Sequence, residues 1–137
     1  DLKEFARLAS LAFDSYREAD WVFEELGPFH DLLLNVWFQA GESSRALREG
    51  REWLKRFPDS LNHLQTVGRL EFVAGHYRES AKYLKAFADQ RPDSLVVNRQ
   101  LARVYSAMGD KDSALAAVKR SLERRSRRRR RSRRLVP

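Results

Sequence analysis

Apolar residues recur along this chain at steps of three and four positions, which is the spacing of one face of an α-helix. The pattern is clearest on either side of Gly75. The apolar positions are Leu61, Leu64, Val67, Leu70, Phe72 and Val73 before this glycine, and Tyr77, Ala81, Leu84, Phe87 and Ala88 after it. The two stretches predict a pair of amphipathic helices. Gly75 stands where the first helix must end, because glycine tolerates the left-handed conformation needed there.

The same arrangement occurs three times with a period of 34 residues, centred on Gly41, Gly75 and Gly109. Aligned on these glycines, the repeated positions are Leu33/Val67/Leu101, Leu34/Gly68/Ala102, Trp37/Glu71/Tyr105 and Ala46/Ser80/Ala114. Small residues such as Gly68, Ala102, Ser80 and Ala114 allow two helices of a pair to approach closely. One pair alone exposes an apolar face, so successive pairs must stack to bury a continuous core.

Each unit also has a predicted end. Pro58 and Pro92 follow their glycines by 17 residues, and the third unit has Ser126 at this position. Proline stops the second helix of a pair. The Asp-Ser sequence after each proline, at 59–60 and 93–94, supplies good capping residues for the helix that follows.

A period of 34 residues with a turn glycine in the middle, small residues at the helix crossing and a closing proline resembles the tetratricopeptide repeat. The resemblance implies an all-α fold, a right-handed α-solenoid of stacked antiparallel helix pairs. It places three repeats at residues 28–60, 61–94 and 95–123.

Residues 1–27 carry a weaker fourth copy. The segment from Asp14 to Ala19 is similar to the turn and helix start around Gly75, and Leu8-Ala9 precedes it as Leu101-Ala102 does in the third unit. The spacing departs from 34 residues, so we interpret the segment as a degenerate pair of short helices that ends at Gly27-Pro28. The alternative is one long amphipathic helix from Leu2 to Leu26.

The positive net charge of +8 comes from the C-terminal tail, residues 124–137. Residues 124–134 hold nine arginines, and without them the remaining chain has a formal charge of −1 against +8 for the whole. The high pI therefore describes a tail, and a nucleic-acid interaction would depend on that tail alone. The tail is either a native basic arm or a vector-derived remnant, because Leu135-Val136-Pro137 resembles the start of a thrombin cleavage site. Helix-forming arginines also allow the last helix to continue into it.

The sequence contains no clear catalytic, metal-binding or phosphate-binding motif. His30, His63 and His76 lie in separate units without a second ligand at metal-binding spacing, and Gly109-Asp110-Lys111 lacks the glycine run of a phosphate-binding loop. There is no cysteine, and no apolar run approaches the ~20 residues of a membrane span. We therefore expect no enzyme activity, no cofactor and no metal. The chain opens at Asp1 without a methionine, which favours a fragment or a processed form.

In the family that the chain resembles, the first helix of each pair lines a concave groove that holds a peptide or a partner helix. Carried over by alignment, the groove residues are Asn35, Phe38, Gln39, Gln65, Thr66, Arg69, Phe72, Val73, Arg99, Gln100, Arg103 and Ser106. Asparagine and glutamine can bond both groups of a bound backbone, and arginines favour carboxylates. The expected partner is a protein or peptide segment with acidic residues. The alternative for the arginines is a solvated surface that pairs with Glu71 or Asp112.

A carboxylate clamp, as in family members that bind chaperone tails, is not predicted. Asn35 matches one of its positions, but the other four are occupied by Asp31, Thr66, Val96 and Gln100. Aromatic residues at the apolar repeat positions are assigned to the core: Trp37, Trp53, Tyr77, Tyr83, Phe87 and Tyr105. Trp21 and Phe23 lie near an array end, where a further repeat or a partner would cover them.

These features predict a non-catalytic scaffold for protein–protein interaction. The lack of cysteine and the loose repeats favour a bacterial envelope or secretion protein, although such arrays also occur in eukaryotic complexes. The alternative is binding of nucleic acid or an acidic partner through the arginine-rich tail. Asn35, Arg69 and Arg103 at equivalent sites do not form a base-reading code. The oligomeric state stays open.

Overall fold

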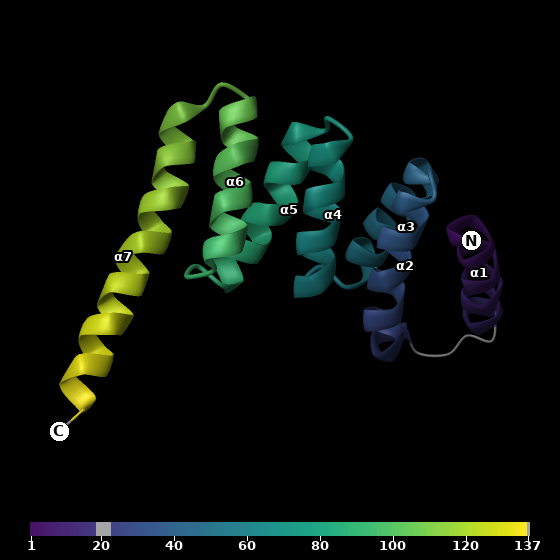
Figure 1. Cartoon of the computed structure of the whole chain (residues 1–137), viewed down its shortest axis with the longest axis horizontal. Coiled ribbons are helices and arrows are strands. Elements are labelled where there is room, and N and C mark those ends of the chain that lie inside the picture. The colour runs from purple at the N-terminus through teal and green to yellow at the C-terminus, as the bar shows by residue number, and fades with distance from the viewer. Residues whose placement is uncertain (19–22, 137) are drawn as a thin grey trace. The chain divides into compact units, whose positions relative to one another are not determined.

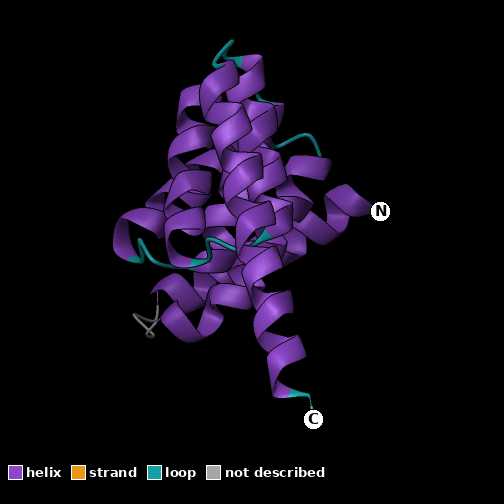
Figure 2. Cartoon of the chain, turned by 90° about the vertical axis from the view of Figure 1, so that its left-hand side faces the viewer, coloured by secondary structure: helices purple, strands orange, loops and turns teal. Residues whose placement is uncertain are grey.

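The computed structural model describes residues 1–18 and 23–136. Within these ranges the chain consists of seven α-helices, one short 3-10 helix and connecting loops, with no strand (Figure 1, Figure 2). The helices are α1 (Leu2–Glu18), α2 (Gly27–Gln39), α3 (Ser43–Arg56), α4 (Leu61–Val73), α5 (Tyr77–Gln90), α6 (Leu95–Ala107) and α7 (Lys111–Leu135), and the 3-10 helix η1 spans Phe23–Leu26. No helix among the described residues has the length and apolar character to cross a membrane.

One glycine follows the first helix of each pair and ends it. Gly41, Gly75 and Gly109 have φ of 89°, 84° and 79°, in the left-handed region that favours glycine. In each turn the residue after the glycine donates a backbone hydrogen bond to a carbonyl five residues earlier, as from His76 to Glu71 at 2.8 Å. This is the Schellman arrangement, which satisfies carbonyls left open at a helix end. The predicted turns are confirmed.

The contacts divide the chain into two compact units, Asp1–Leu70 and Glu71–Pro137. In the first unit α2 packs against both α3 and α1. Its core contains Leu33, Leu34, Trp37, Ala46, Leu64 and Val67. The close approach of helices is visible at Gly50, where an added Cβ would lie 2.5 Å from Val67 Cγ2. A glycine that the repeat alignment did not select therefore marks a tight helix contact.

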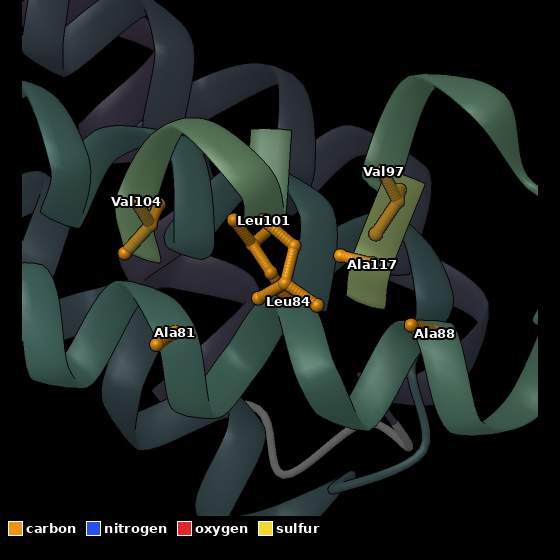
Figure 3. Packing of buried hydrophobic residues seen from close by; sticks show 7 residues of the cluster. All are labelled: Ala81, Leu84, Ala88, Val97, Leu101, Val104 and Ala117. Carbon is orange, nitrogen blue, oxygen red and sulfur yellow. The ribbon is translucent and has the colours of Figure 1, made fainter. Parts of the chain in front are cut away.

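In the second unit α6 packs against α5 and α7. Its core consists of Ala81, Leu84, Ala88, Val97, Leu101, Val104 and Ala117 (Figure 3). The cluster combines alanines of α5 and α7 with larger residues of α5 and α6, which allows close packing of the helices. Ala114, which the repeat alignment places at the crossing, is only half-buried, whereas Ala117 is 3% exposed.

The N-terminal segment differs from the predicted pair of short helices. α1 is one continuous helix through the expected turn at Asp14-Ser15 and ends at Glu18, before the Leu26 of the alternative. It buries Ala6, Ala9 and Phe13, a step of three and four that one helix face satisfies. Residues 19–22, which include Trp21, lie outside the described residues, as does the side chain of Phe23. Gly27-Pro28 begin α2, where proline suits the first helical turn.

Two local expectations, the helix-capping serines and the aromatic core residues, hold only in part. Ser94 caps α6 as expected, because its side chain accepts a hydrogen bond from the Val97 backbone nitrogen at 3.4 Å. The hydroxyl of Ser60 instead contacts His63 Nδ1 at 2.8 Å. Tyr77 is not a core residue, since 37% of it is exposed, although its ring lies 5.5 Å from that of Phe72.

Candidate protein-binding surface

The residues predicted for a partner groove lie on the first helices of the three pairs, α2, α4 and α6. Gln39, Arg69, Arg99 and Arg103 are exposed; Asn35, Phe38, Gln65, Phe72 and Gln100 are half-buried; Thr66 is buried. Asn35 to Arg69 belong to the first compact unit and Phe72 to Arg103 to the second.

In the first unit, equivalent positions of successive first helices meet. The guanidinium of Arg69 donates a hydrogen bond to Oδ1 of Asn35, 34 residues earlier. The Asn35 amide nitrogen donates in turn to the backbone oxygen of Asp31 at 3.0 Å. The contact joins two of the predicted groove residues, and Arg69 remains exposed. One repeat period along the sequence thus corresponds to one step between neighbouring helices on this surface.

Asp31 and Thr66 lie behind this contact. Burial raises the pKa of the Asp31 carboxyl, and this rise is opposed by a hydrogen bond from Thr66 and by the charge of Arg69. Oδ1 of Asp31 is buried without a hydrogen-bond partner among the described residues. Thr66 is 8% exposed, and its hydroxyl is used by Asp31. Asp31 is therefore a residue of this surface that the sequence alignment assigned only as a mismatch.

The second unit contains a hollow of about 790 Å³ between α6 and α7. Its lining is mostly apolar: Phe72, Ala102, Ala107, Ala114, Leu115 and Val118, with Arg103, Ser106 and Lys111 as polar members. Phe72 and Arg103, both predicted groove residues, line the same hollow. Arg99 is exposed on the same helix as Arg103, four residues earlier.

Glu71 is not part of the exposed face of its helix. It is fully buried, and its Oε2 lies 2.7 Å from Nδ1 of His76. Burial thus removes this carboxylate from the exposed face on which a pairing with the arginines was expected.

The first unit contains a buried histidine pair that the sequence did not reveal. The histidines were expected to be scattered, yet His30 Nδ1 lies 2.9 Å from His63 Nε2, and both residues are 1% exposed. The Trp53 ring stacks on both imidazoles, with centroid distances of 4.4 Å and 4.7 Å. Burial lowers the pKa of His30 to about 3, with the charges of His63 and Arg17 adding to the shift, and burial lowers that of His63 to about 4. The available signal was the spacing of 33 residues, one less than the repeat period.

A second hollow, of about 410 Å³, opens beside this stack. Its floor is aromatic, formed by Phe13, His30, Trp53 and Phe57, and its rim carries Arg17, Glu49, Glu52, Lys55 and Arg56. The Trp53 indole nitrogen is buried without a hydrogen-bond partner among the described residues. Across those residues, no three His, Cys, Asp or Glu side chains gather into a possible metal site.

The arginine-rich segment is helical. α7 continues without a break to Leu135, so the last helix does run into the arginines. Arg128 pairs with Asp93 at 2.7 Å. Arg124, Arg127 and Arg128 line a hollow of about 610 Å³ together with Arg91 and Asp93. The helix therefore presents a strongly basic surface at the end of the second unit.

Comparison with known proteins identifies the repeat. Residues 72–134 match the family model described as tetratricopeptide repeat. A solved structure of MamA AMB-1 has a TM-score of 0.69 and 21% sequence identity, and the match covers 84% of this chain and 61% of the MamA chain. A structure of MamA MSR-1 has a TM-score of 0.67 and 21% identity over 88% of this chain and 67% of that chain. No curated protein sequence matches the chain.

This chain thus spans about three fifths of the first MamA chain, which it resembles in fold. The seven helices and these likenesses confirm the predicted fold class, an all-α solenoid of helix pairs. The fold and the family match support a scaffold for protein–protein interaction.

Proposed function

Because this chain belongs to the tetratricopeptide repeat family, we propose that it binds a partner protein through the exposed faces of its first helices, α2, α4 and α6. The chain acts as a scaffold and carries out no chemistry. The partner contributes an extended or helical segment with apolar side chains and with aspartate or glutamate.

The hollow of the second unit carries this proposal. Phe72, Leu115 and Val118 give it an apolar lining, and Arg103 and Lys111 place positive charge at its border. A pocket of this kind favours a ligand with an apolar anchor and a nearby carboxylate, since an arginine can hold a carboxylate through two parallel hydrogen bonds. In the first unit, Arg69 and Asn35 offer similar chemistry, and Gln65 offers an amide to a bound backbone.

The proposal is tested by reversing charge on the first helices. The double variant Arg69→Glu/Arg103→Glu should weaken binding of the partner that co-purifies with this chain by more than ~2 kcal/mol, because attractive contacts become repulsive. The matched control is Arg48→Glu/Lys85→Glu, the same charge change at exposed positions of the second helices α3 and α5. Binding is measured by titration calorimetry, with circular dichroism to verify the fold. A partner that binds the double variant as tightly as the parent would show that this surface is not the site.

A second candidate function rests on the basic helix. Nine arginines on the exposed end of α7 would neutralise phosphates or an acidic protein without sequence-specific contacts. This activity would belong to the tail alone, independent of the first helices. The wider setting in a bacterial envelope or secretion assembly stays a prediction from the sequence.

A further inference from the structure

The first and last helices each leave an apolar face uncovered. On α1, Phe5, Leu8 and Leu11 are 52%, 53% and 54% exposed, although the helix buries its other apolar face in the first unit. On α7, Leu115 and Leu122 are each 54% exposed and Val118 is 37% exposed. Each face lies wholly within one compact unit. Exposed apolar residues that gather on one helix face indicate an interaction surface.

The exposed side of α7 has the spacing of a coiled-coil seam. At alternating steps of four and three, the positions are Lys111, Leu115, Val118, Leu122, Arg125 and Arg129, all of them exposed. Such a spacing keeps residues in line along a partner helix. The α7 seam therefore has an apolar centre, one cation at its start and two at its end.

The exposed side of α1 has a seam of complementary composition. At alternating steps of three and four, its positions are Asp1, Glu4, Leu8, Leu11, Ser15 and Glu18, all of them exposed. Here the centre is apolar and the ends are acidic. Phe5 flanks Leu8 and adds to the apolar centre.

Aligned antiparallel, the two seams agree every seven residues, with each three-residue step of α1 opposite a four-residue step of α7. Leu8 then meets Leu122, and Leu11 meets Val118. In the same register, three acidic residues meet three cations: Glu18 with Lys111, Glu4 with Arg125, and Asp1 with Arg129. Both seams span about 18 residues, or roughly 26 Å at the rise of an α-helix. The remaining pair, Ser15 with Leu115, adds neither an apolar contact between two large side chains nor an ion pair.

We propose that the occupant of the α7 seam is α1 of a second copy of this chain, so that copies associate head to tail. The interface is heterologous, because two different surfaces of each copy meet, and such contacts build closed rings or open chains. Glu4 now bonds Arg7 at 2.7 Å, but both side chains are exposed, and such surface pairs exchange at little cost. This association is distinct from the proposed partner binding, although both use Lys111, Leu115 and Val118 of the second-unit hollow.

The experiment blocks one seam at a time. The variant Leu8→Glu/Leu11→Glu removes the α1 seam, and Val118→Glu/Leu122→Glu removes the α7 seam. All four side chains are exposed, so the fold should survive, and circular dichroism verifies this. Molar mass is measured by sedimentation velocity from about 1 µM to about 1 mM, the range in which weak interfaces associate. Leu32→Glu/Val96→Glu, which changes two residues that are 54% and 57% exposed outside both seams, is the matched control.

The parent and the matched control should grow beyond a dimer as concentration rises. Each blocked variant alone should stay a monomer of 16.1 kDa. An equal mixture of the two should form a dimer and nothing larger, because one intact α1 seam and one intact α7 seam remain. A monomeric parent would overturn the proposal, as would a blocked variant that still associates with itself.

A charge exchange tests the register. Glu4→Arg alone and Arg125→Glu alone should each weaken association by more than about fivefold, since like charges then meet. Both changes in one chain should restore it. Failure of the double variant to recover would refute the antiparallel pairing. Self-association should persist in Arg69→Glu/Arg103→Glu, which separates this proposal from partner binding by the first helices.

Discussion

The buried histidine pair should make the stability of the first unit depend on pH. His30 and His63 have pKa values of about 3 and about 4 in the folded chain, against an ordinary value of 6.5. The unfolded chain therefore binds more protons below pH 6.5. The stabilising contribution is fully present above that pH and is lost as pH falls towards the folded pKa values.

The magnitude follows from the same two values. Between about pH 7 and about pH 5, each histidine should lower the free energy of unfolding by roughly 2 kcal/mol. Two histidines give a loss of roughly 4 kcal/mol, a large part of the ~5–15 kcal/mol by which a typical domain is stable. Carboxyl groups with lowered pKa, Glu4 and Asp110, act in the same direction, but they titrate at lower pH and are fully exposed.

Urea unfolding followed by tryptophan fluorescence measures this effect in the first unit, because Trp37 and Trp53 are buried in it and no tryptophan occurs in the sequence after residue 70. The variant His63→Gln keeps an amide that can bond His30 and Ser60 and removes one titrating group. Its loss of stability over the same pH range should be about half that of the parent. A parent with equal stability at the two pH values, or a variant with an unchanged pH dependence, would refute the neutral buried pair.

Three further changes test packing and the tail. Gly50→Ala should destabilise the first unit by about 1–3 kcal/mol, since its Cβ would lie 2.5 Å from Val67 Cγ2, whereas Arg48→Ala on the same helix should have little effect in urea unfolding. In the second unit, Ala117→Phe should cost about 1–3 kcal/mol and Ala114→Phe less, because only Ala117 is fully enclosed; equal melting temperatures would contradict this assignment. Truncation after Glu123 should abolish any binding to a generic DNA duplex at low salt, and the intact chain should lose affinity steeply as salt rises in fluorescence anisotropy. Binding that survives truncation would place the nucleic-acid site outside the tail.

The sequence predicted the parts of the fold that depend on local chemistry. A period of 34 residues located the turns at Gly41, Gly75 and Gly109, because each needs a residue that tolerates positive φ. It did not locate the single helix α1, because a solvent-exposed turn signal at Asp14-Ser15 also fits an uninterrupted helix. Repeat spacing predicts the helix ends of the regular repeats better than those of a degenerate terminal copy.

The candidate surface was predictable only in outline. Alignment selected Phe72 and Arg103, which line one hollow, and Asn35 and Arg69, which bond each other. It could not show that Thr66 faces Asp31, because burial depends on how neighbouring helices pack. The histidine pair was missed for the same reason, since its partners come from α2 and α4 and only the folded chain brings them together.

Site-specific photo-crosslinking tests the central claim, that the first helices bind the partner. A photoreactive residue is placed at Gln39 or Arg99, exposed on α2 and α6, and in control chains at Arg48 or Lys85, exposed on α3 and α5. The co-purifying partner should be crosslinked from Gln39 and Arg99 and not from the controls. Crosslinks from Arg48 and Lys85 without any from the first helices would contradict it.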